Sequence, residues 1–397
     1  MNPPIGTGGD RKRPTFACVY PDASNVHLVK DIGMVGNVLA REHGFRSLFV
    51  CLDRGRDYPY LADQARWLEM VKLQDDPAYR QFRWPPKSVI SFLWKTSREI
   101  DVLQLFNHTR ETMLLGSIYK WRNPGGFLHL KLDANEPWIA GEIARRNSSR
   151  WIAFAEYLQP HLWIRRRPDL VTAETSTSLA LFQELYPWVG DRLKLLPNGV
   201  DDFWLDREGF MEIRREDKEN VLLVVGRIGT VQKNTELLLD ALSGLEFGNW
   251  KAILAGPIAE PFRPKIEAFF RARPDLRERV LFLGEVRDRK ELYGWYRKAK
   301  VFCMTSRFEG FSLALVDAIH FGCHVVSTPV SSIDDVLARG RFGKVVHSAP
   351  ELERELGGLF RGESDPLREF EATRKHSESY RWSSICRNLA EWIGRRN

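Results

Sequence analysis

The chain has 397 residues, of which 43% are hydrophobic, and a formal net charge of +7. This length exceeds what a single hydrophobic core usually organises, so we expect two domains of nearly equal size. The sequence contains no apolar run long enough to cross a bilayer and no secretory signal, and its five cysteines lack C-x-x-C spacing; these features argue against a membrane-spanning protein, a disulfide framework and a zinc knuckle.

The charge and the cysteines narrow the setting of the protein without identifying a partner. An excess of lysine and arginine attracts anions, which leaves nucleic acid, anionic lipid and phosphorylated small molecules open. An odd number of cysteines, several of them inside apolar runs, fits a reducing compartment. We therefore expect buried thiols in a cytoplasmic protein, with the inner face of the membrane as an open alternative. Residues 1–13 are rich in glycine, proline and charge, and we expect them to be disordered.

Apolar runs alternate with amphipathic stretches through the first half of the chain. This pattern predicts parallel strands joined by helical crossovers, the arrangement of a doubly wound α/β domain. We expect this first domain over residues 14–200. Its predicted strands cover residues 15–20, 47–52, 89–93, 101–106, 126–133 and 169–173.

Two polar positions in the first half are candidates for catalysis. In the strand 126–133, alternation places His129, Lys131 and Asp133 on the face opposite the leucines. Asp133 comes last, at the carboxyl end, where ligands of such sheets bind. His108 follows the preceding strand and is the second candidate, with a buried structural histidine as the alternative.

Residues 138–167 interleave aromatic and basic side chains. Such a surface is typical of a peripheral enzyme that touches anionic lipid. Helices that pack on the sheet through their aromatics, with solvated arginines, are the slightly preferred alternative. No nucleic-acid motif accompanies the pattern, so we expect no nucleic-acid partner. The residues that would contact a membrane are Trp151, Trp163, Arg165, Arg166 and Arg167.

The second half repeats the pattern of strands and helices after a charged stretch. Residues 201–219 show no sustained period and are predicted to link the two domains. A second doubly wound domain is expected over residues 220–380, followed by a helix over 381–397 whose packing on the first domain is left open. The predicted strands of the second domain cover residues 220–225, 250–255, 280–283, 299–304 and 324–327.

A cationic segment follows the first strand of the second domain. Arg227 comes directly after Gly226, and its planar guanidinium suits phosphate oxygens. Lys233 adds a charge close to a helix that Asn234 is expected to cap. The segment matches neither G-x-G-x-x-G nor the Walker pattern, which argues against a dehydrogenase and a P-loop enzyme. A basic pair on the surface beside an ordinary helix is the alternative. The apolar residues of that helix, spaced at i, i+3, i+4 and i+7, are Leu238, Ala241, Leu242 and Leu245.

A loop with a glycine follows the strand 299–304. Glu309 precedes a helix over residues 313–321 that Gly322 ends, and the start of that helix is an anion site suited to a diphosphate. Asp317 lies eight residues after Glu309 in an apolar helix, which favours a functional pair of carboxylates over a solvated loop acid. We expect free backbone amides at Ser312, Leu313 and Ala314.

Taken together, these motifs resemble glycosyltransferase family 4 and its relatives. The family carries G-R and a following lysine, then E-G-F-[GS], with a second acid eight residues after the first glutamate. The resemblance covers residues 171–329 and implies the GT-B fold, in which two doubly wound Rossmann-like domains face each other across a cleft. It also implies retaining transfer of a hexose-type sugar from a nucleoside diphosphate sugar to an acceptor hydroxyl. The other segments that match are 171–175, 197–201 and 283–286, followed by Glu291, Leu292 and Tyr296.

The resemblance implies roles for individual residues. Arg227 and Lys233 bind the donor diphosphate, and Glu309 contacts the donor sugar. Asp317 stands where the family more often has a glutamate that holds the ribose. Asp133 or His108 takes the place of a histidine that relatives carry in the first domain. The other donor-binding candidates are Gly226, Val286, Lys30 and Gly33, with the backbone of Gly310, Phe311, Ser312, Leu313 and Ala314.

The same resemblance sets the expected partners. The acceptor is a glycan or a lipid-linked glycan, in the assembly of a cell-surface polysaccharide or glycolipid. The sequence contains no D-x-D motif, so we expect neither a metal nor another cofactor. The alternatives are another GT-B enzyme, such as a nucleotide-sugar epimerase or a phosphorylase, and a non-catalytic GT-B subunit that binds a partner enzyme.

Overall fold

A computed structural model describes residues 13–81, 84–133, 136–148 and 168–395. The expected disorder of residues 1–12 falls outside these ranges, as do Trp151, Trp163 and the arginines at 165–167. Across the described residues, no helix combines the length and the apolar character that crossing a bilayer requires. All five cysteines are buried free thiols, which confirms their expected place in the core.

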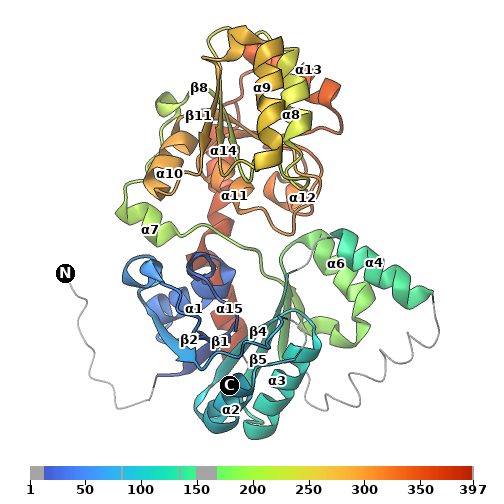
Figure 1. The fold of residues 1–397 in the computed structure, drawn as a ribbon. Coiled ribbons are helices and arrows are strands. Elements are labelled where there is room, and N and C mark those ends of the chain that lie inside the picture. The colour runs from blue at the N-terminus through green and yellow to red at the C-terminus, as the bar shows by residue number, and fades with distance from the viewer. Residues whose placement is uncertain (1–12, 82–83, 134–135, 149–167, 396–397) are drawn as a thin grey trace. The chain divides into compact units, whose positions relative to one another are not determined.

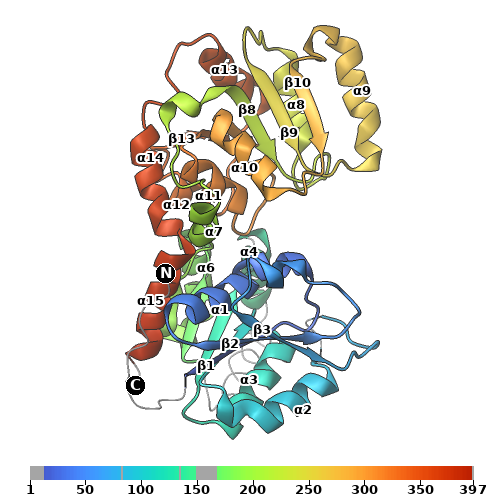
Figure 2. The same ribbon diagram turned by 90° about the vertical axis from the view of Figure 1, so that its left-hand side faces the viewer.

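The first sheet has seven strands in the order β3-β2-β1-β4-β5-β6-β7. The first five strands in this order, β3, β2, β1, β4 and β5, pair in parallel. Helix α1 packs on β1, β2 and β3, and Figure 2 shows α2 and α3 on the opposite side of these strands. The strands are β1 (Thr15–Val19), β2 (Arg46–Leu52), β3 (Leu68–Leu73), β4 (Val102–Phe106), β5 (Phe127–Leu132), β6 (Leu170–Ala173) and β7 (Leu193–Leu195). The helices are α1 (Asp31–Glu42), α2 (Lys87–Thr96), α3 (Arg110–Arg122), α4 (Glu136–Asn147) and α6 (Ser176–Leu185).

The second sheet has six parallel strands in the order β10-β9-β8-β11-β12-β13 (Figure 1). Its strands are β8 (Glu219–Val225), β9 (Lys251–Ala255), β10 (Val280–Gly284), β11 (Ala299–Met304), β12 (His324–Ser327) and β13 (Gly343–Val345). The helices of this part of the chain are α7 (Asp202–Arg207), α8 (Thr235–Ser243), α9 (Arg263–Ala272), α10 (Arg289–Lys298), α11 (Leu313–His320), α12 (Ile333–Val336), α13 (Ala349–Phe360), α14 (Phe370–Ser377) and α15 (Trp382–Gly394).

Both faces of the second sheet are buried, because alternate residues of each strand pack into different clusters. On β8, Val221 and Leu223 belong to the cluster formed with α10 and α11, whereas Leu222 and Val224 belong to the cluster formed with α8 and α13. Strands buried on both sides appear in the sequence as continuous apolar runs, which explains why the run at residues 220–225 was predictable. The prediction of an α/β fold with two parallel, helix-covered sheets is confirmed.

The chain divides into two compact units. One contains the residues up to Lys131, and the other contains residues 172–388. Strand β7 lies in the second of these units, whereas β6 is divided between the two units after Val171. Both strands extend the first sheet by hydrogen bonding. The domain limits expected from the sequence, 14–200 and 220–380, stay a prediction.

One expectation about local structure was wrong. Residues 89–93 form part of helix α2, in which only Val89 and Leu93, four positions apart, are buried, so the apolar run follows one helix face. Strand β5 is buried on both faces, and its polar residues His129 and Lys131 are fully enclosed. Lys131 forms an ion pair with Asp31 of α1, with an Nζ–Oδ2 distance of 3.4 Å.

Three short strands escaped prediction from the sequence. Strand β3 has the sequence LEMVKL, in which charged residues interrupt the apolar ones, and it lies at the edge of the first sheet. Strands β7 and β13 have three residues each, too few for an alternating pattern to stand out from a loop.

Candidate functional site

The loops that follow β8 and β11 meet at one edge of the second sheet. Strand β8 lies between β9 and β11. The chain continues from β8 to β9 and β10 on one side and then crosses to β11 on the other side, so the strand order changes direction at β8. In open parallel sheets such a switch of direction, at the carboxyl ends of the strands, is the usual place for a ligand. The predicted residues Arg227, Lys233 and Glu309 all lie on these two loops.

Glycines shape the loop after β8. Gly229 has a φ of +80°, and a Cβ there would lie 2.2 Å from the side chain of Phe262, so a larger residue does not fit. The side chain of Lys233 crosses the backbone at Gly226, where a Cβ would approach the lysine Cε to 3.0 Å. The absence of side chains at these two positions therefore allows the loop to bring Lys233 back over the end of its own strand.

Lys233 and Glu309 join the two loops through an ion pair. The Nζ–Oε1 distance is 2.6 Å, and the side chains are 18% and 11% exposed. The same carboxylate accepts hydrogen bonds from the Ser306 hydroxyl at 2.6 Å and from the Gln232 amide at 3.2 Å. Glu309 is thus held in one orientation by three donors on both loops.

Arg227 is the exposed member of the group. Its guanidinium donates to the side-chain oxygen of Gln232, whose amide nitrogen in turn bonds to Glu309. Gln232 therefore connects Arg227 to the Lys233 and Glu309 pair. The structure brings together the three residues that the sequence predicted, and it adds Gln232 and Ser306 as the groups that hold them.

The backbone of the two loops is cross-linked beside this cluster. The Arg307 amide donates to the Gln232 carbonyl at 2.8 Å, and the Thr305 hydroxyl donates to the Lys233 carbonyl at 3.0 Å. Asn234 precedes α8 with a left-handed φ of 48° and makes no side-chain capping bond, contrary to expectation. Its side-chain oxygen accepts from the Arg307 guanidinium at 2.9 Å, so it serves the loop contact instead.

The start of helix α11 supplies backbone donors next to Glu309. The prediction that the Ser312 amide is free was wrong, because it donates to the Ser332 hydroxyl at 3.3 Å. Leu313 and Ala314 occupy the first two helical positions, where an α-helix has no internal acceptor for its amides. Gly322 follows the helix with a φ of +70°, as expected for its end. The helix therefore keeps an anion-binding N-terminus of two amides rather than three.

Asp317 belongs to a second polar group on the same sheet. It accepts a hydrogen bond from the Tyr293 hydroxyl at 3.1 Å, and that hydroxyl accepts one from the Arg289 guanidinium at 2.7 Å. Arg289 also lies over the Trp204 ring, 4.8 Å from its centroid. Burial raises the pKa of the Asp317 carboxyl to about 6, although Arg289 and Tyr293 act in the opposite direction.

The candidates in the first sheet sit in different surroundings. Exposed Lys30 comes directly before α1, and Gly33 is buried in that helix, where a Cβ would lie 2.4 Å from the Leu28 carbonyl oxygen. Asp133 is exposed just beyond the carboxyl end of β5. Burial lowers the pKa of His108 to about 4, so its imidazole is neutral near pH 7. Val286 lies between β10 and α10 and is partly buried.

Sequence reasoning missed Arg289 and Tyr293. The two side chains are four positions apart on α10, the spacing that places residues on one helix face, and this spacing was the available signal. Gln232 and Ser306 carried no such signal, because their role depends on the pairing of two loops whose sequence positions are more than seventy residues apart.

The comparisons with known proteins agree with the fold of two parallel, helix-covered sheets. Residues 219–361 match the model of a family described as "Glycosyl transferases group 1". A stretch of 130 residues is 33% identical to the lipopolysaccharide core biosynthesis mannosyltransferase LpcC of Rhizobium leguminosarum, covering 31% of this chain and 36% of the relative. A stretch of 205 residues is 28% identical to an alpha-1,4-N-acetyl-D-galactosaminyltransferase of Campylobacter jejuni whose name specifies a saccharide on PP-undecaprenol, covering 49% and 53%.

A solved structure extends the likeness over nearly the whole chain. The Anabaena protein Alr3699/HepE, determined in complex with UDP and glucose, superposes with a TM-score of 0.65 at 16% identity and covers 97% of this chain and 100% of its own. The chain matches only about one third to one half of the length of the curated relatives named above. The comparisons therefore give the chain the GT-B fold of known glycosyltransferases, and they relate residues 219–361 to the glycosyl transferases group 1 family.

Proposed function

We propose that the chain is a retaining glycosyltransferase that moves a hexose-type sugar from a nucleoside diphosphate sugar to an acceptor hydroxyl. The cluster of Arg227, Lys233 and Glu309 at the edge of the second sheet carries this proposal. Two cations and the N-terminus of α11 suit a diphosphate, and a fixed carboxylate beside them suits sugar hydroxyls. Retention comes from the resemblance of the motifs to glycosyltransferase family 4.

The proposed chemistry concerns the charge that develops on the leaving diphosphate. As the bond to the sugar breaks, the sugar becomes oxocarbenium-like and the diphosphate gains negative charge. Arg227, Lys233 and the amides of Leu313 and Ala314 stabilise that charge where it appears, a contribution that is often the largest single one in such reactions. With these groups in place, we propose that transfer proceeds without a metal.

Glu309 has acceptor capacity left for the donor sugar. A carboxylate has about four acceptor positions, and within the described residues Lys233, Ser306 and Gln232 occupy three of them. The remaining position, on Oε2, is the proposed contact with a sugar hydroxyl. Glu309 therefore combines two tasks, which are to orient Lys233 and to bind the sugar.

Asp317 is the proposed contact with the ribose. An aspartate is one methylene shorter than the glutamate of most relatives, so we propose a bond to the ribose hydroxyls through water. The Tyr293 hydroxyl fixes the carboxylate in position, and Arg289 fixes the tyrosine. Val286 and Gly226 are the proposed neighbours of the base and of the diphosphate.

The acceptor is proposed to be a glycan or a lipid-linked glycan of the cell surface. The names of the Rhizobium and Campylobacter relatives, a lipopolysaccharide core enzyme and an enzyme for a PP-undecaprenol saccharide, support this choice. Lys30, Gly33 and Asp133 are the proposed contributions of the first sheet to catalysis and donor binding. We propose a cytoplasmic enzyme at the inner face of the membrane.

Exposed tryptophans support the membrane contact. Trp94 on α2 and Trp121 on α3 are 45% and 56% exposed, and their rings lie 4.8 Å apart. Arg122 lies 5.1 Å from the Trp94 ring, which adds a positive charge to the aromatic pair. Tryptophan beside arginine suits the surface of an anionic bilayer. The double variant Trp94→Ala, Trp121→Ala should lose co-sedimentation with phosphatidylglycerol vesicles; wild-type protein that stays in the supernatant would contradict the contact.

Product analysis tests the proposed reaction. The purified chain is incubated with UDP-, GDP-, ADP- and CMP-sugars and a glycan acceptor, with EDTA present. We expect one donor to give a glycosylated acceptor with the anomeric configuration of the donor, by NMR. An epimerised nucleotide sugar without acceptor, or transfer that requires phosphate, identifies an epimerase or a phosphorylase instead, and an inverted product contradicts retention.

A further inference from the structure

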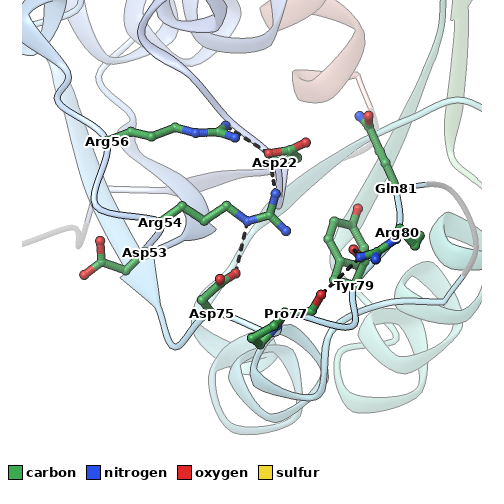
Figure 3. Close-up of a pocket in the computed structure, with 9 residues that line it drawn as sticks. All are labelled: Asp22, Asp53, Arg54, Arg56, Asp75, Pro77, Tyr79, Arg80 and Gln81. Carbon is green, nitrogen blue, oxygen red and sulfur yellow. Dashed lines mark hydrogen bonds and ion pairs between the residues drawn. The ribbon is translucent and has the colours of Figure 1, made fainter.

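A polar pocket opens at the carboxyl edge of the first sheet. Its volume is about 710 Å³, a size that accommodates a small-molecule ligand. The segments that line it follow three adjacent parallel strands: Asp22 comes after β1, Arg54 and Arg56 after β2, and Asp75 after β3 (Figure 3). In a doubly wound sheet this edge is the ligand-binding one.

Arg54 fixes the acidic groups of the pocket. Its Nη1 lies 2.8 Å from Asp22 Oδ1 and its Nε lies 3.0 Å from Asp75 Oδ1, so it bridges the segments after β1 and β3. Arg56 adds a second ion pair to Asp22 at 2.9 Å and donates to the Ala23 carbonyl at 2.6 Å. Figure 3 shows Arg54 and Arg56 converging on Asp22. The charged groups are therefore arranged before a ligand arrives.

Hydrogen bonds also hold Tyr79 and Gln81 in place at the pocket. Tyr79 is 6% exposed, and its hydroxyl donates to the buried Glu111 carboxylate at 3.0 Å. Next to it, the Gln81 amide donates to the Tyr20 hydroxyl at 2.9 Å. The Arg54 guanidinium lies 5.8 Å from the centroid of the Tyr79 ring. These bonds hold the Tyr79 ring and the Gln81 amide, both after β3, at the side of the pocket.

The balance of charge indicates the kind of ligand. The lining contains three aspartates, Asp22, Asp53 and Asp75, and three arginines, so the pocket is neutral. An anion would have to draw Arg54 or Arg56 away from carboxylates less than 3.1 Å distant, or Arg80 away from the Pro77 and Tyr79 carbonyls. A neutral polyol can leave these ion pairs intact, because the remaining acceptor positions of the carboxylates accept from its hydroxyls and the remaining N–H groups of the guanidiniums donate to its oxygens.

We infer that this pocket binds a neutral, hydroxyl-rich saccharide. Its identification as the acceptor rests on the proposed function, whereas saccharide binding itself rests only on the pocket. The pocket is built entirely from residues before β4, apart from the Glu111 contact behind Tyr79, and it uses none of the residues of the second sheet. The two sites can therefore be tested separately.

The test measures saccharide binding to the full chain by calorimetry and saturation-transfer NMR. The probes are methyl α-D-mannopyranoside, methyl α-D-glucopyranoside and N-acetylglucosamine, with glucose 6-phosphate and inorganic phosphate as anionic counterparts. Asp75→Asn removes one acceptor of the pocket, and Asp76→Asn is the matched control, because Asp76 is the next residue and does not line the pocket. We expect a neutral probe to bind, Asp75→Asn to weaken it about tenfold, and Asp76→Asn to leave it unchanged.

Further outcomes separate the inference from its alternatives. If Asp75→Asn alters the melting temperature, Asp22→Asn serves as the second variant, and the same loss is expected. Binding of phosphate or glucose 6-phosphate that exceeds binding of neutral probes and strengthens in Asp75→Asn would overturn the inference in favour of an anion site. Failure of every neutral probe would also overturn it. Saccharide binding that persists in Lys233→Ala, while no nucleotide binds wild-type protein, would reject the proposed function and keep the pocket.

Discussion

Lys233 and Glu309 form an ion pair with an Nζ–Oε1 distance of 2.6 Å, although they are 76 positions apart in the sequence. They stand on loops that follow two adjacent strands, so the folding of the sheet itself brings the pair together. In the ligand-free protein Glu309 orients the ammonium group and offsets part of its charge. A bound diphosphate has to share Lys233 with this carboxylate.

Removal of either cation should reduce turnover without unfolding the protein. Arg227→Ala and Lys233→Ala each remove a group that stabilises charge on the leaving diphosphate, so kcat should fall about 100-fold or more. Lys251→Ala is the matched control, because Lys251 is an exposed lysine at the amino end of β9, on the opposite edge of the same sheet. Normal activity in both site variants, with melting temperatures equal to that of the control, would reject their proposed role.

Glu309→Gln should separate binding from catalysis. The amide retains the size of the side chain but removes the charge that offsets Lys233, so a nucleoside diphosphate should bind more tightly, about three- to tenfold. Turnover should fall, because the sugar loses a charged acceptor. Calorimetry with the nucleoside diphosphate and steady-state kinetics measure the two effects. Weaker binding together with unchanged kcat would show that Glu309 neither restrains Lys233 nor serves the sugar.

Asp317 should make donor binding depend on pH. Burial raises its pKa to about 6, so the carboxylate is ionised above this value and protonated below it. Donor affinity should fall as the pH decreases through about 6, and Asp317→Asn should abolish this step. Binding that shows the same pH profile in both proteins would exclude Asp317 from the donor site.

The raised pKa of Asp317 affects folding stability in the opposite direction from donor binding. The folded-state pKa lies above the ordinary value of 3.8, so the folded protein holds the proton over a range where the unfolded chain has lost it. The free energy of unfolding should therefore decrease as the pH rises from 3.8 to about 6, and Asp317→Asn should lack this decrease. Urea unfolding of both proteins across this range measures the difference.

Gly256 should tolerate no side chain. Its φ is +144°, and a Cβ would lie 1.8 Å from the Gly226 carbonyl oxygen, beside the proposed diphosphate site. Gly256→Ala should lower the free energy of unfolding by about 3 kcal/mol. Gly294→Ala is the control, because a Cβ on this helical glycine would meet no atom within 4 Å and should add about 1 kcal/mol of stability. Equal stability of the two variants, by urea unfolding, would contradict the packing of the loops.

Much of the fold was predictable because its strands are buried on both faces. The runs at residues 15–20 and 220–225 are continuous apolar segments, and both are strands. The run at residues 89–93 has the same composition but forms a helix, since periodicity cannot separate a short buried strand from one face of a helix. Strand β3 was missed because it lies at the edge of the sheet, where charged residues interrupt the apolar run that marks a buried strand.

The residues of the candidate site that come shortly after a strand were predictable. Arg227 and Glu309 follow β8 and β11, and motif spacing was enough to single them out. The partners that hold them could not be found in this way, because Gln232 and Ser306 acquire their roles only when the two loops pair. The pocket around Arg54 depends likewise on three strands becoming neighbours in space.

Nucleotide binding to matched variants tests the central claim most directly. The melting temperature of wild-type protein, Lys251→Ala and the double variant Arg227→Ala, Lys233→Ala is measured with UDP, GDP, ADP and CMP, since a ligand that binds only the folded state raises it. We predict that one nucleoside diphosphate stabilises the wild type and Lys251→Ala but not the double variant. Equal stabilisation of all three proteins, or of none by any nucleotide, would contradict a donor site at the edge of the second sheet.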